Sequence, residues 1–357
     1  MTSYLGSKHW APAVLQDLVF LQRGFDITKA QQKKGEVPVF SSSGLSSWHN
    51  EAKVQGPGII IGRKGTLGSV HYSDGDYWPH DTTLWSKSLN GNNPRFVYFA
   101  LKCLGLERFN VGGANPTLNR NHIHGLPIHL PERDAQDRIV SILSTYDDLI
   151  ENNRRRIALL EEAARLLYRE WFVHLRFPGH EHIPITDGLP EGWERRTFGK
   201  VAELKYGKAL KKENRVEGPF PVYGSSGIVG THQKALVEGP TIIIGRKGNV
   251  GSVFWSPADF WPIDTVYFIP KDQADFWLYL ALPSAGFQNT DAGVPGLNRD
   301  FAYSRKLVQP KERLRRHFNE AVEPMFAQRA RLEAYNEKLS QARDLLLPRL
   351  MNGEITV

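Results

Sequence analysis

The residues best suited to chemistry in this sequence lie in two glycine-rich loops that repeat each other. The segment IIIGRKGTLGSV spans residues 59–70 and IIIGRKGNVGSV spans residues 242–253, so ten of twelve letters agree at an offset of 183. Glycines on both sides of an Arg-Lys pair allow sharp turns that leave backbone N–H groups exposed beside two cations. Such a loop suits a phosphate group, whereas the alternative is a tight hairpin whose charges are only solvated.

Other polar residues near these loops add candidate contacts. Serine clusters at residues 41–43 and 225–226 could donate to phosphates or base edges, or could simply close turns. The pairs Asn119-Arg120 and Asn298-Arg299 suit bidentate contacts to adenine and guanine, or else the junction with a neighbouring helix. The candidate DNA-binding residues are Ser42, Ser43, Arg63, Lys64, Thr66, Asn119, Arg120, Tyr223, Ser225, Ser226, Arg246, Lys247, Asn249, Asn298 and Arg299.

Two aspartates occupy matching positions in the segments WPHDTT and WPIDTV. Asp81 and Asp264 could accept a hydrogen bond from a cytosine amino group. They could instead cap a turn, and we favour this structural role.

Residues typical of an enzyme are hard to find. His122 and His124 have no matching pair in the second copy, and Glu203 to Lys205 imitates the end of a nuclease motif without a suitable preceding Asp. Cys103 lies in an apolar helical pattern and is interpreted as a core residue. We therefore expect no catalytic residue and no metal site in this chain.

Composition narrows the class of protein. The 357 residues include 41% hydrophobic and 23% charged residues, which is typical of a globular protein. The formal net charge of +7 points towards an anionic partner, such as nucleic acid, an acidic protein or a membrane surface, although proteins that bind none of these also carry such an excess. The single cysteine excludes an intrachain disulfide and suits a reducing cytoplasm. The start lacks a signal-peptide pattern, and no apolar run reaches the roughly 18 residues of a membrane span.

The chain is a tandem duplication. PVFSSSGL matches PVYGSSGI at the offset of 183, and TLNR matches GLNR at an offset of 179. Each copy begins with about 130 residues of short runs rich in Val, Ile, Phe and Tyr between Gly and Pro, a pattern that predicts strands. Short helices are expected at 94–104 and 272–282, and each copy ends in about 45 residues of helical pattern.

The helical parts carry a heptad pattern, with apolar residues spaced by four and three positions. In the first part this pattern runs from Ile139 to Trp171, and in the second, with polar exceptions at Arg329, Asn336 and Arg343, from Phe318 to Leu350. An antiparallel coiled coil in one register would bring together the pairs Asn153–Asn336, Trp171–Phe318, Ile157–Leu332, Ile150–Leu339 and Leu143–Leu346. At about 1.5 Å per residue, 40 helical residues would hold the strand-rich domains roughly 60 Å apart.

These features together predict an α+β fold. It has two duplicated strand-rich domains separated by two long antiparallel helices that form a coiled coil, with approximate twofold symmetry. The expected parts are a first domain at residues 1–131, a central helix at 132–178, a second domain at 179–309 and a C-terminal helix at 310–357.

The sequence resembles the specificity subunit of type I restriction-modification systems over nearly all of its length. The resemblance lies in LLYREWFVHLRFPG followed by LPEGWERRTFGKVAEL, in the ending LLLPRLMNGEITV and in IIIGRKGTLGSV. One departure is at the start of each long helix, where Asp134-Ala135-Gln136 and its aligned counterpart Leu314-Arg315-Arg316 only partly keep the usual Glu-Gln.

The resemblance implies a non-catalytic DNA-binding subunit with two target recognition domains. Each domain would read one half of a bipartite target, and the helices would set the gap between the halves. Double-stranded DNA, two methyltransferase subunits and two motor-nuclease subunits are the implied partners. S-adenosylmethionine, ATP and Mg²⁺ would belong to those partners, and the complex would act in the cytoplasm of a bacterium or archaeon.

Two alternatives and one finer expectation remain open from the residues. The chain could be a nuclease of two similar domains that acts alone, or a coiled-coil scaffold whose strand-rich domains bind protein. Because the two domains are so alike, the half-sites are expected to share bases and to give a partly palindromic target. The segments TKAQQKKGE and KKENRVEGP differ between the copies and are expected to read different features.

Overall fold

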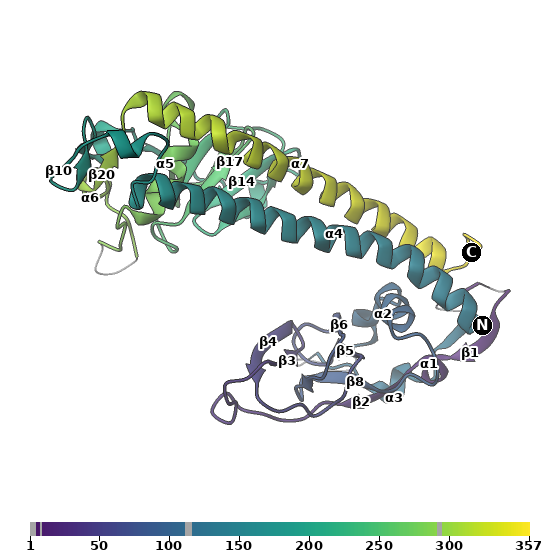
Figure 1. Ribbon diagram of the computed structural model, residues 1–357. Helices are drawn as coiled ribbons and strands as arrows, with labels where there is room; N and C mark the ends of the chain where they lie inside the picture. The colour runs from purple at the N-terminus through teal and green to yellow at the C-terminus, as the bar shows by residue number, and fades with distance from the viewer. Residues whose placement is uncertain (1–4, 8, 111–115, 291–294) are drawn as a thin grey trace. The chain divides into compact units, whose positions relative to one another are not determined.

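The computed structural model, which describes residues 5–7, 9–110, 116–290 and 295–357, divides into two units. Unit 1 comprises Met1–Asn152 and Tyr335–Val357, and unit 2 comprises Asn153–Ala334. The two long helices contribute to both units (Figure 1). Among the described residues, no helix combines the length and the apolar character that crossing a bilayer requires.

Unit 1 builds its strand-rich part from three small sheets. Their strand orders are β2-β8-β5-β6, β4-β3-β7 and β1-β9; the β3–β7 pair is parallel and the other strand pairs in these sheets are antiparallel. The strands are β1 (Ala11–Val14), β2 (Phe20–Arg23), β3 (Val37–Ser41), β4 (Gly44–His49), β5 (Gly58–Gly62), β6 (Val70–Ser73), β7 (Trp78–Pro79), β8 (Thr83–Ser88) and β9 (Pro127–Leu130). The short helices are α1 (Leu15–Leu18), α2 (Pro94–Cys103) and α3 (Arg120–Ile123).

Unit 2 repeats these sheets in the same order. They are β13-β19-β16-β17, β15-β14-β18 with a parallel β14–β18 pair, and β12-β20, while β10 and β11 form a separate hairpin. The strands are β10 (Ile185–Thr186), β11 (Leu189–Pro190), β12 (Glu194–Thr197), β13 (Lys205–Tyr206), β14 (Phe220–Gly224), β15 (Gly227–His232), β16 (Thr241–Gly245), β17 (Val253–Ser256), β18 (Trp261–Pro262), β19 (Val266–Phe268) and β20 (Lys306–Gln309). The short helices are α5 (Phe276–Ala281) and α6 (Arg299–Ser304). The prediction of two duplicated strand-rich domains is therefore confirmed.

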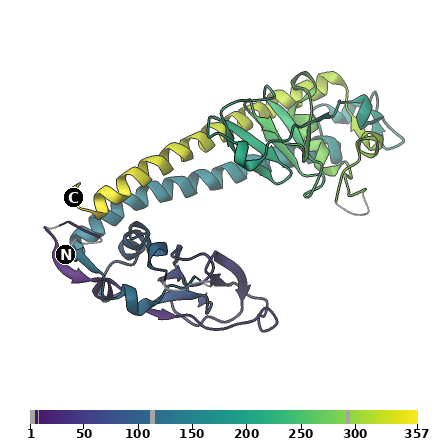
Figure 2. The ribbon, with the colours of Figure 1, turned by 180° about the vertical axis from the view of Figure 1, so that it is seen from behind.

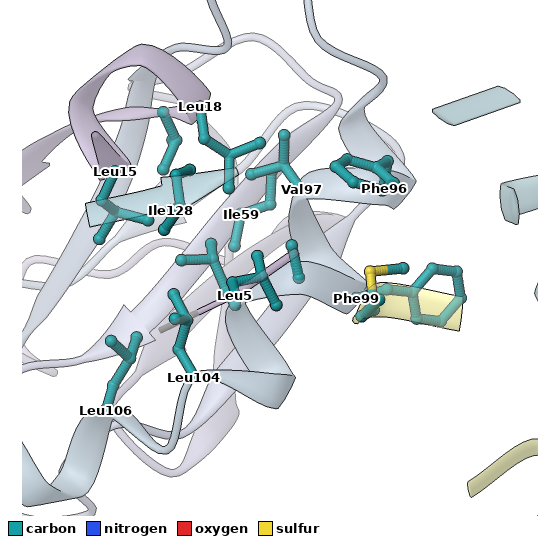
Figure 3. Close-up of a cluster of buried hydrophobic side chains, with 14 of the residues drawn as sticks. Leu5, Leu15, Leu18, Ile59, Phe96, Val97, Phe99, Leu104, Leu106 and Ile128 are labelled. Carbon is teal, nitrogen blue, oxygen red and sulfur yellow. The ribbon is translucent and has the colours of Figure 1, made fainter. Parts of the chain in front are cut away.

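The isoleucine runs explain why β5 and β16 are interior strands. Each lies between two neighbours, and all five of its residues are buried, as a continuous apolar run predicts for a strand covered on both faces. In unit 2, Ile242 and Ile244 join the large core while Ile243 joins a small cluster with Tyr223 and Phe260. Figure 3 shows the core of unit 1, an apolar cluster to which Ile59 from β5 and Leu15 and Leu18 from α1 all belong.

The long helices are α4 (Arg133–Tyr168), which continues as a π-helical turn at Arg169–Val173, and α7 (Glu312–Met351). Figures 1 and 2 show α4 in teal and α7 in yellow running side by side. In unit 2 the rings of Trp171 and Phe318 lie 5.6 Å apart, which confirms this predicted pair. In unit 1 Leu143 and Leu346 belong to one apolar cluster. The predicted Asn153–Asn336 pair stays a prediction.

The polar exceptions in the heptad pattern of α7 are explained by partners on α4. Arg329 Nε lies 3.2 Å from Glu161 Oε1 in unit 2, and Arg343 Nη1 lies 2.6 Å from Asp147 Oδ1 in unit 1. Asn336 Nδ2 donates to the carbonyl of Ile150 at 3.4 Å. The seam is thus apolar at most positions. At these three positions polar or charged side chains are hydrogen-bonded, which a coiled coil tolerates when each polar group is paired.

Candidate nucleic-acid interface

The basic loops connect β5 to β6 in unit 1 and β16 to β17 in unit 2, and they are closed in the same way. Gly62 N donates to the carbonyl of Ser69 at 2.8 Å, and Gly245 N donates to that of Ser252 at 2.7 Å. Gly68 has a φ of 73° and Gly251 a φ of 77°, a region that L side chains rarely adopt. The repeated glycines therefore set a tight, rigid loop in both copies.

The backbone amides of the Arg-Lys pairs themselves are not available to an anion. Arg63 N and Lys64 N both donate to the carbonyl of Thr82, at 2.8 and 3.1 Å. In unit 2, Arg246 N and Lys247 N donate to that of Thr265, at 2.8 and 3.0 Å. These amides are satisfied within the fold, so an anion would meet the side chains instead.

The side chains of these loops remain accessible. Lys64 and Thr66 are exposed in unit 1, as are Lys247 and Asn249 at the matching positions of unit 2. Arg63 and Arg246 are half-buried. Each loop thus offers an exposed ammonium group and a neutral hydrogen-bonding side chain around a better-fixed guanidinium, a combination suited to a polyanion.

Two serines that the sequence analysis overlooked, Ser69 and Ser252, hold the serine turns against the loops. The serine turns are the clusters at residues 41–43 and 225–226. Ser69 Oγ donates to the carbonyl of Ser42, and Ser252 Oγ donates to that of Ser225 at 2.6 Å. Ser42 itself is buried. The signal for this contact was the Gly-Ser before the last valine of both loop segments, and each serine turn also carries an exposed serine, Ser43 or Ser226.

The LNR segments, residues 118–120 and 297–299, lie beside the same loops. Leu118 N donates to the carbonyl of Arg63 at 2.9 Å, and Leu297 N donates to that of Arg246 at 2.7 Å. Three motifs of each copy that are distant in sequence are therefore brought together: the serine turn, the basic loop and the LNR segment.

Within the LNR segments, the asparagines cap the short helices that follow. Asn119 Oδ1 accepts from Asn121 N at 3.0 Å, and Asn298 Oδ1 accepts from Asp300 N at 2.8 Å. This is the usual role of an N-cap asparagine. Arg120 is half-buried and Arg299 is exposed, so the arginines are the better candidates for contact.

Tyr223 does not belong to the surface. Its side chain is only 6% exposed and packs against Phe254 and Phe260, with ring centroids 6.5 and 5.4 Å away. Burial also raises the pKa of its hydroxyl, with weaker opposing effects from Ser256 and Arg329. Tyr223 is a core residue, and its inclusion among the candidate contacts was wrong because β14 turns it inwards.

In unit 1 the loop arginine stands beside an ion pair. Arg63 Nη1 lies 3.4 Å from the carbonyl of Asp81, whose carboxylate accepts from Arg23 at 2.9 Å. Burial, and then the nearby charge of Arg23, lower the pKa of Arg63. Two guanidinium groups thus lie close to each other at this surface, and a bound polyanion would relieve their repulsion.

In unit 2 the loop arginine stands beside aromatic rings instead. Arg246 Nη1 donates to the carbonyl of Asp264 at 3.1 Å, and its guanidinium lies 5.0 Å from the Tyr206 ring centroid. The guanidinium of Arg299 lies 5.2 Å from the same ring. The basic loop and the LNR segment of unit 2 therefore converge on Tyr206, which is half exposed and which the sequence analysis overlooked.

One group of metal-ligand type occurs among the described residues. Ligand atoms of Asp26, His80 and Asp81 lie within 4.8 Å of one another. Because Arg23 already occupies the Asp81 carboxylate, a cation is a poor occupant of this place. The equivalent of His80 in unit 2 is Ile263, so the group is not part of the duplicated arrangement.

Each copy joins a basic loop, a serine turn and an arginine to a strand-rich domain followed by a long helix, which defines a duplicated binding module. The family model described as Type I restriction modification DNA specificity domain matches residues 7–162 and 190–294. The match covers most of the chain, and the chain therefore belongs to this family.

Named relatives agree with this assignment. The type I restriction enzyme MjaIX specificity subunit of Methanocaldococcus jannaschii is 23% identical over 298 residues, which cover 73% of this chain and 69% of the relative. The HindI specificity subunit of Haemophilus influenzae is 21% identical over 330 residues, covering 68% and 72%. The crystal structure of a type I system S subunit from M. genitalium has the same fold, with a TM-score of 0.61, 20% identity and coverage of 98% and 99%. The alternative of a nuclease that acts alone finds no support in these relatives.

Proposed function

We propose that the chain is the non-catalytic DNA reader of a type I restriction-modification complex. Its recognition domains, residues 1–131 and 179–309, each read one half of a bipartite duplex target. The helical segments, residues 132–178 and 310–357, set the gap between the halves. The observation that carries this proposal is that both copies gather the same serine turn, basic loop and LNR segment at one place.

In each domain, some of the proposed contacts bind DNA phosphates and others recognise bases. Lys64, Arg63 and their counterparts Lys247 and Arg246 grip phosphates with their side chains, because their backbone amides are used within the fold. Arg120, Arg299 and the exposed serines Ser43 and Ser226 complete the surface. Asn119 and Asn298 position the arginine that follows each of them.

The chemistry of the complex belongs to the partners in this proposal. Two methyltransferase subunits dock on the helices and flip a target adenine for methylation with S-adenosylmethionine. Two motor-nuclease subunits use ATP and Mg²⁺. The contribution of this chain is to choose the site and to hold the partners over it.

The decisive experiment is to reconstitute the chain with its methyltransferase subunits and sequence the methylated DNA by a single-molecule method. We expect one bipartite motif with a fixed gap. Methylation that ignores sequence, or Mg²⁺-dependent cleavage by the chain alone, would overturn the proposal in favour of another reading.

The loop arginines provide a second test. Replacement of Arg63 or Arg246 by Ala should weaken DNA binding and lower the salt dependence of log K by about one ion for each lost phosphate contact. Arg196→Ala is the matched control, since Arg196 is an exposed arginine of β12 that pairs with Glu194 at 2.7 Å, away from the loops. An unchanged salt slope in the loop variants would place these arginines off the DNA.

A further inference from the structure

Among the positions at which the two sites differ, one carries a cationic side chain in the first copy and an aromatic ring in the second. Arg23 pairs with Leu84 in the β2–β8 register, and Tyr206 pairs with Tyr267 in the β13–β19 register. All four residues are related by the offset of 183. Arg23 and Tyr206 are therefore structural equivalents. Arg23 pairs with the aspartate that the loop arginine of its copy contacts, and the ring of Tyr206 lies under the loop arginine of the second copy.

In unit 1 the carboxylate of Asp81 is paired with Arg23, and the Arg23 side chain is exposed. Asp81 Oδ2 accepts from Arg23 Nη2 at 2.9 Å, and Asp81 Oδ1 lies 3.0 Å from His80 Nδ1. The Arg23 side chain is 56% exposed, whereas that of Asp81 is 21% exposed. The pair fixes a guanidinium on a side chain that stays more than half exposed, which is an arrangement suited to guanine O6 and N7.

In unit 2 the equivalent aspartate, Asp264, is exposed. Arg246 and Arg299 both lie over the Tyr206 ring, and Arg246 reaches only the backbone carbonyl of Asp264. The carboxylate of Asp264 is exposed and makes no ion pair within the part of the chain that the structure describes. A bare carboxylate at a surface that meets polyanionic DNA is unfavourable unless it accepts a hydrogen bond from a base amino group.

We infer that the residue at this position sets opposite hydrogen-bonding polarity in the two domains. In the major groove, the first domain offers donors through Arg23 and requires a guanine, whereas the second offers an acceptor through Asp264 and requires a base whose amino group faces that groove, cytosine or adenine. This inference rests on the proposed function. It also limits the expectation of a partly palindromic target, because the two half-sites then differ in what is read at this position.

The test is the methylated motif of the reconstituted complex with three variants. Arg23→Ala should relax one base pair of the first half-site, and Asp264→Asn one base pair of the second, each by roughly 10- to 100-fold in discrimination. Tyr206→Arg should place a guanidinium beside Asp264 and replace the amino-base requirement of the second half-site by guanine. Asp300→Asn is the control, since Asp300 is an exposed carboxylate in α6 of the same domain, and it should leave the motif unchanged.

The outcomes separate this inference from the proposed function. If the unmodified complex methylates no bipartite motif, the proposed function fails. If it methylates one and the Arg23→Ala and Asp264→Asn complexes methylate the same motif with unaltered discrimination, the proposed function stands and this inference is overturned. A change confined to one base pair in the half-site of the mutated domain supports it.

Discussion

The two units attach the start of a long helix to a strand-rich domain through different polar contacts. At the start of α4 in unit 1, Gln136 is 2% exposed, and its Nε2 donates to Asn92 Oδ1 at 2.8 Å while its Oε1 accepts from Asn93 N at 2.9 Å. At the start of α7 in unit 2, Arg315 Nε donates to Asp275 Oδ2 at 2.6 Å, and its guanidinium lies 4.5 Å from the Trp277 ring centroid. A neutral amide pair and an ion pair thus fasten equivalent helices to equivalent domains.

The register of the sheets shows that these residues correspond. Leu130 of β9 pairs with Ala11, and Gln309 of β20 pairs with Glu194, the residue 183 positions after Ala11. Gln136 and Arg315 each lie six residues further on, so Arg315 is the counterpart of Gln136. The alignment of Gln136 with Arg316 was therefore wrong by one residue. The fold requires a satisfied polar anchor here and not a particular charge.

The largest expected effect is a difference in stability between the two units when equivalent core residues of the long helices are replaced by alanine. Phe318 is fully buried between the rings of Trp171 and Phe172, at 5.6 and 4.9 Å, while its counterpart Ile139 is fully buried among aliphatic residues of unit 1. We expect Phe318→Ala to lower the free energy of unfolding by about 3–5 kcal/mol, more than Ile139→Ala does, because aromatic pairs add about 0.5–1.5 kcal/mol to burial. Hydrogen exchange resolved by peptide measures each unit separately.

The loss of protection should be confined to the unit that carries the substitution. Equal loss in both units, or a larger effect of Ile139→Ala, would show that the aromatic cluster gives unit 2 no additional stability.

Much of the fold could be predicted because its signals are local or repeated. The heptad spacing of α4 and α7 follows from burial of one helix face, and the buried isoleucines at 59–61 and 242–244 mark interior strands in both copies. The pairing of Trp171 with Phe318 followed from matching the two heptad patterns. These are features that one segment, or two matching segments, determine by themselves.

The site was less predictable because its details depend on contacts between distant segments. The carbonyls of Thr82 and Thr265 accept hydrogen bonds from the backbone amides of the Arg-Lys pairs. No spacing in the sequence predicts these hydrogen bonds. Tyr206 and Arg23 precede their loops by about 40 residues and differ between the copies, so a search for shared residues passed over both. Tyr223 was misassigned because the side of β14 on which it lies depends on which sheets cover that strand.

A smaller effect tests the anchors directly. Arg315→Gln should destabilise the start of α7 by about 1–3 kcal/mol, because the partly buried Asp275 carboxylate loses its charged partner. The double variant Arg315→Gln with Asp275→Asn restores a neutral amide pair like that of unit 1 and should recover much of the loss. Urea unfolding of the single and double variants gives the coupling energy. Additive losses in the double variant would mean that charge itself is required at this anchor.

The seam arginines should matter less, and equally in both units. Arg329 with Glu161 and Arg343 with Asp147 are only partly buried, with side chains 21–31% exposed, so solvent screens each pair. We expect Arg329→Met and Arg343→Met each to cost about 1 kcal/mol or less, since a methionine stem keeps much of the apolar packing. Unfolding at low and high salt measures this, and a loss well above that figure in either variant would assign the seam charges a structural role.

The smallest expected effect is a pH dependence present in unit 1 alone. Asp137 accepts from Asn93 Nδ2 at 2.5 Å and from Arg133 Nε at 3.0 Å, and these hydrogen bonds lower its pKa below the usual 3.8. A depressed carboxylate pKa stabilises the folded state above the usual value, and this contribution is lost as the pH falls through the depressed value. The corresponding residue of unit 2 is Arg316, which carries no carboxylate.

Asp137→Asn should therefore flatten the fall of stability below about pH 4 at the start of α4, and leave α7 unchanged. Hydrogen exchange of the two helix starts at several acid pH values, compared between Asp137→Asn and the unmodified chain, measures the difference. Asp134→Asn is the control, because Asp134 is an exposed carboxylate in the same first turn. If Asp137→Asn and Asp134→Asn flatten the profile equally, general charge at the helix N-terminus stabilises unit 1, and the hydrogen bond from Asn93 does not distinguish its junction from that of unit 2.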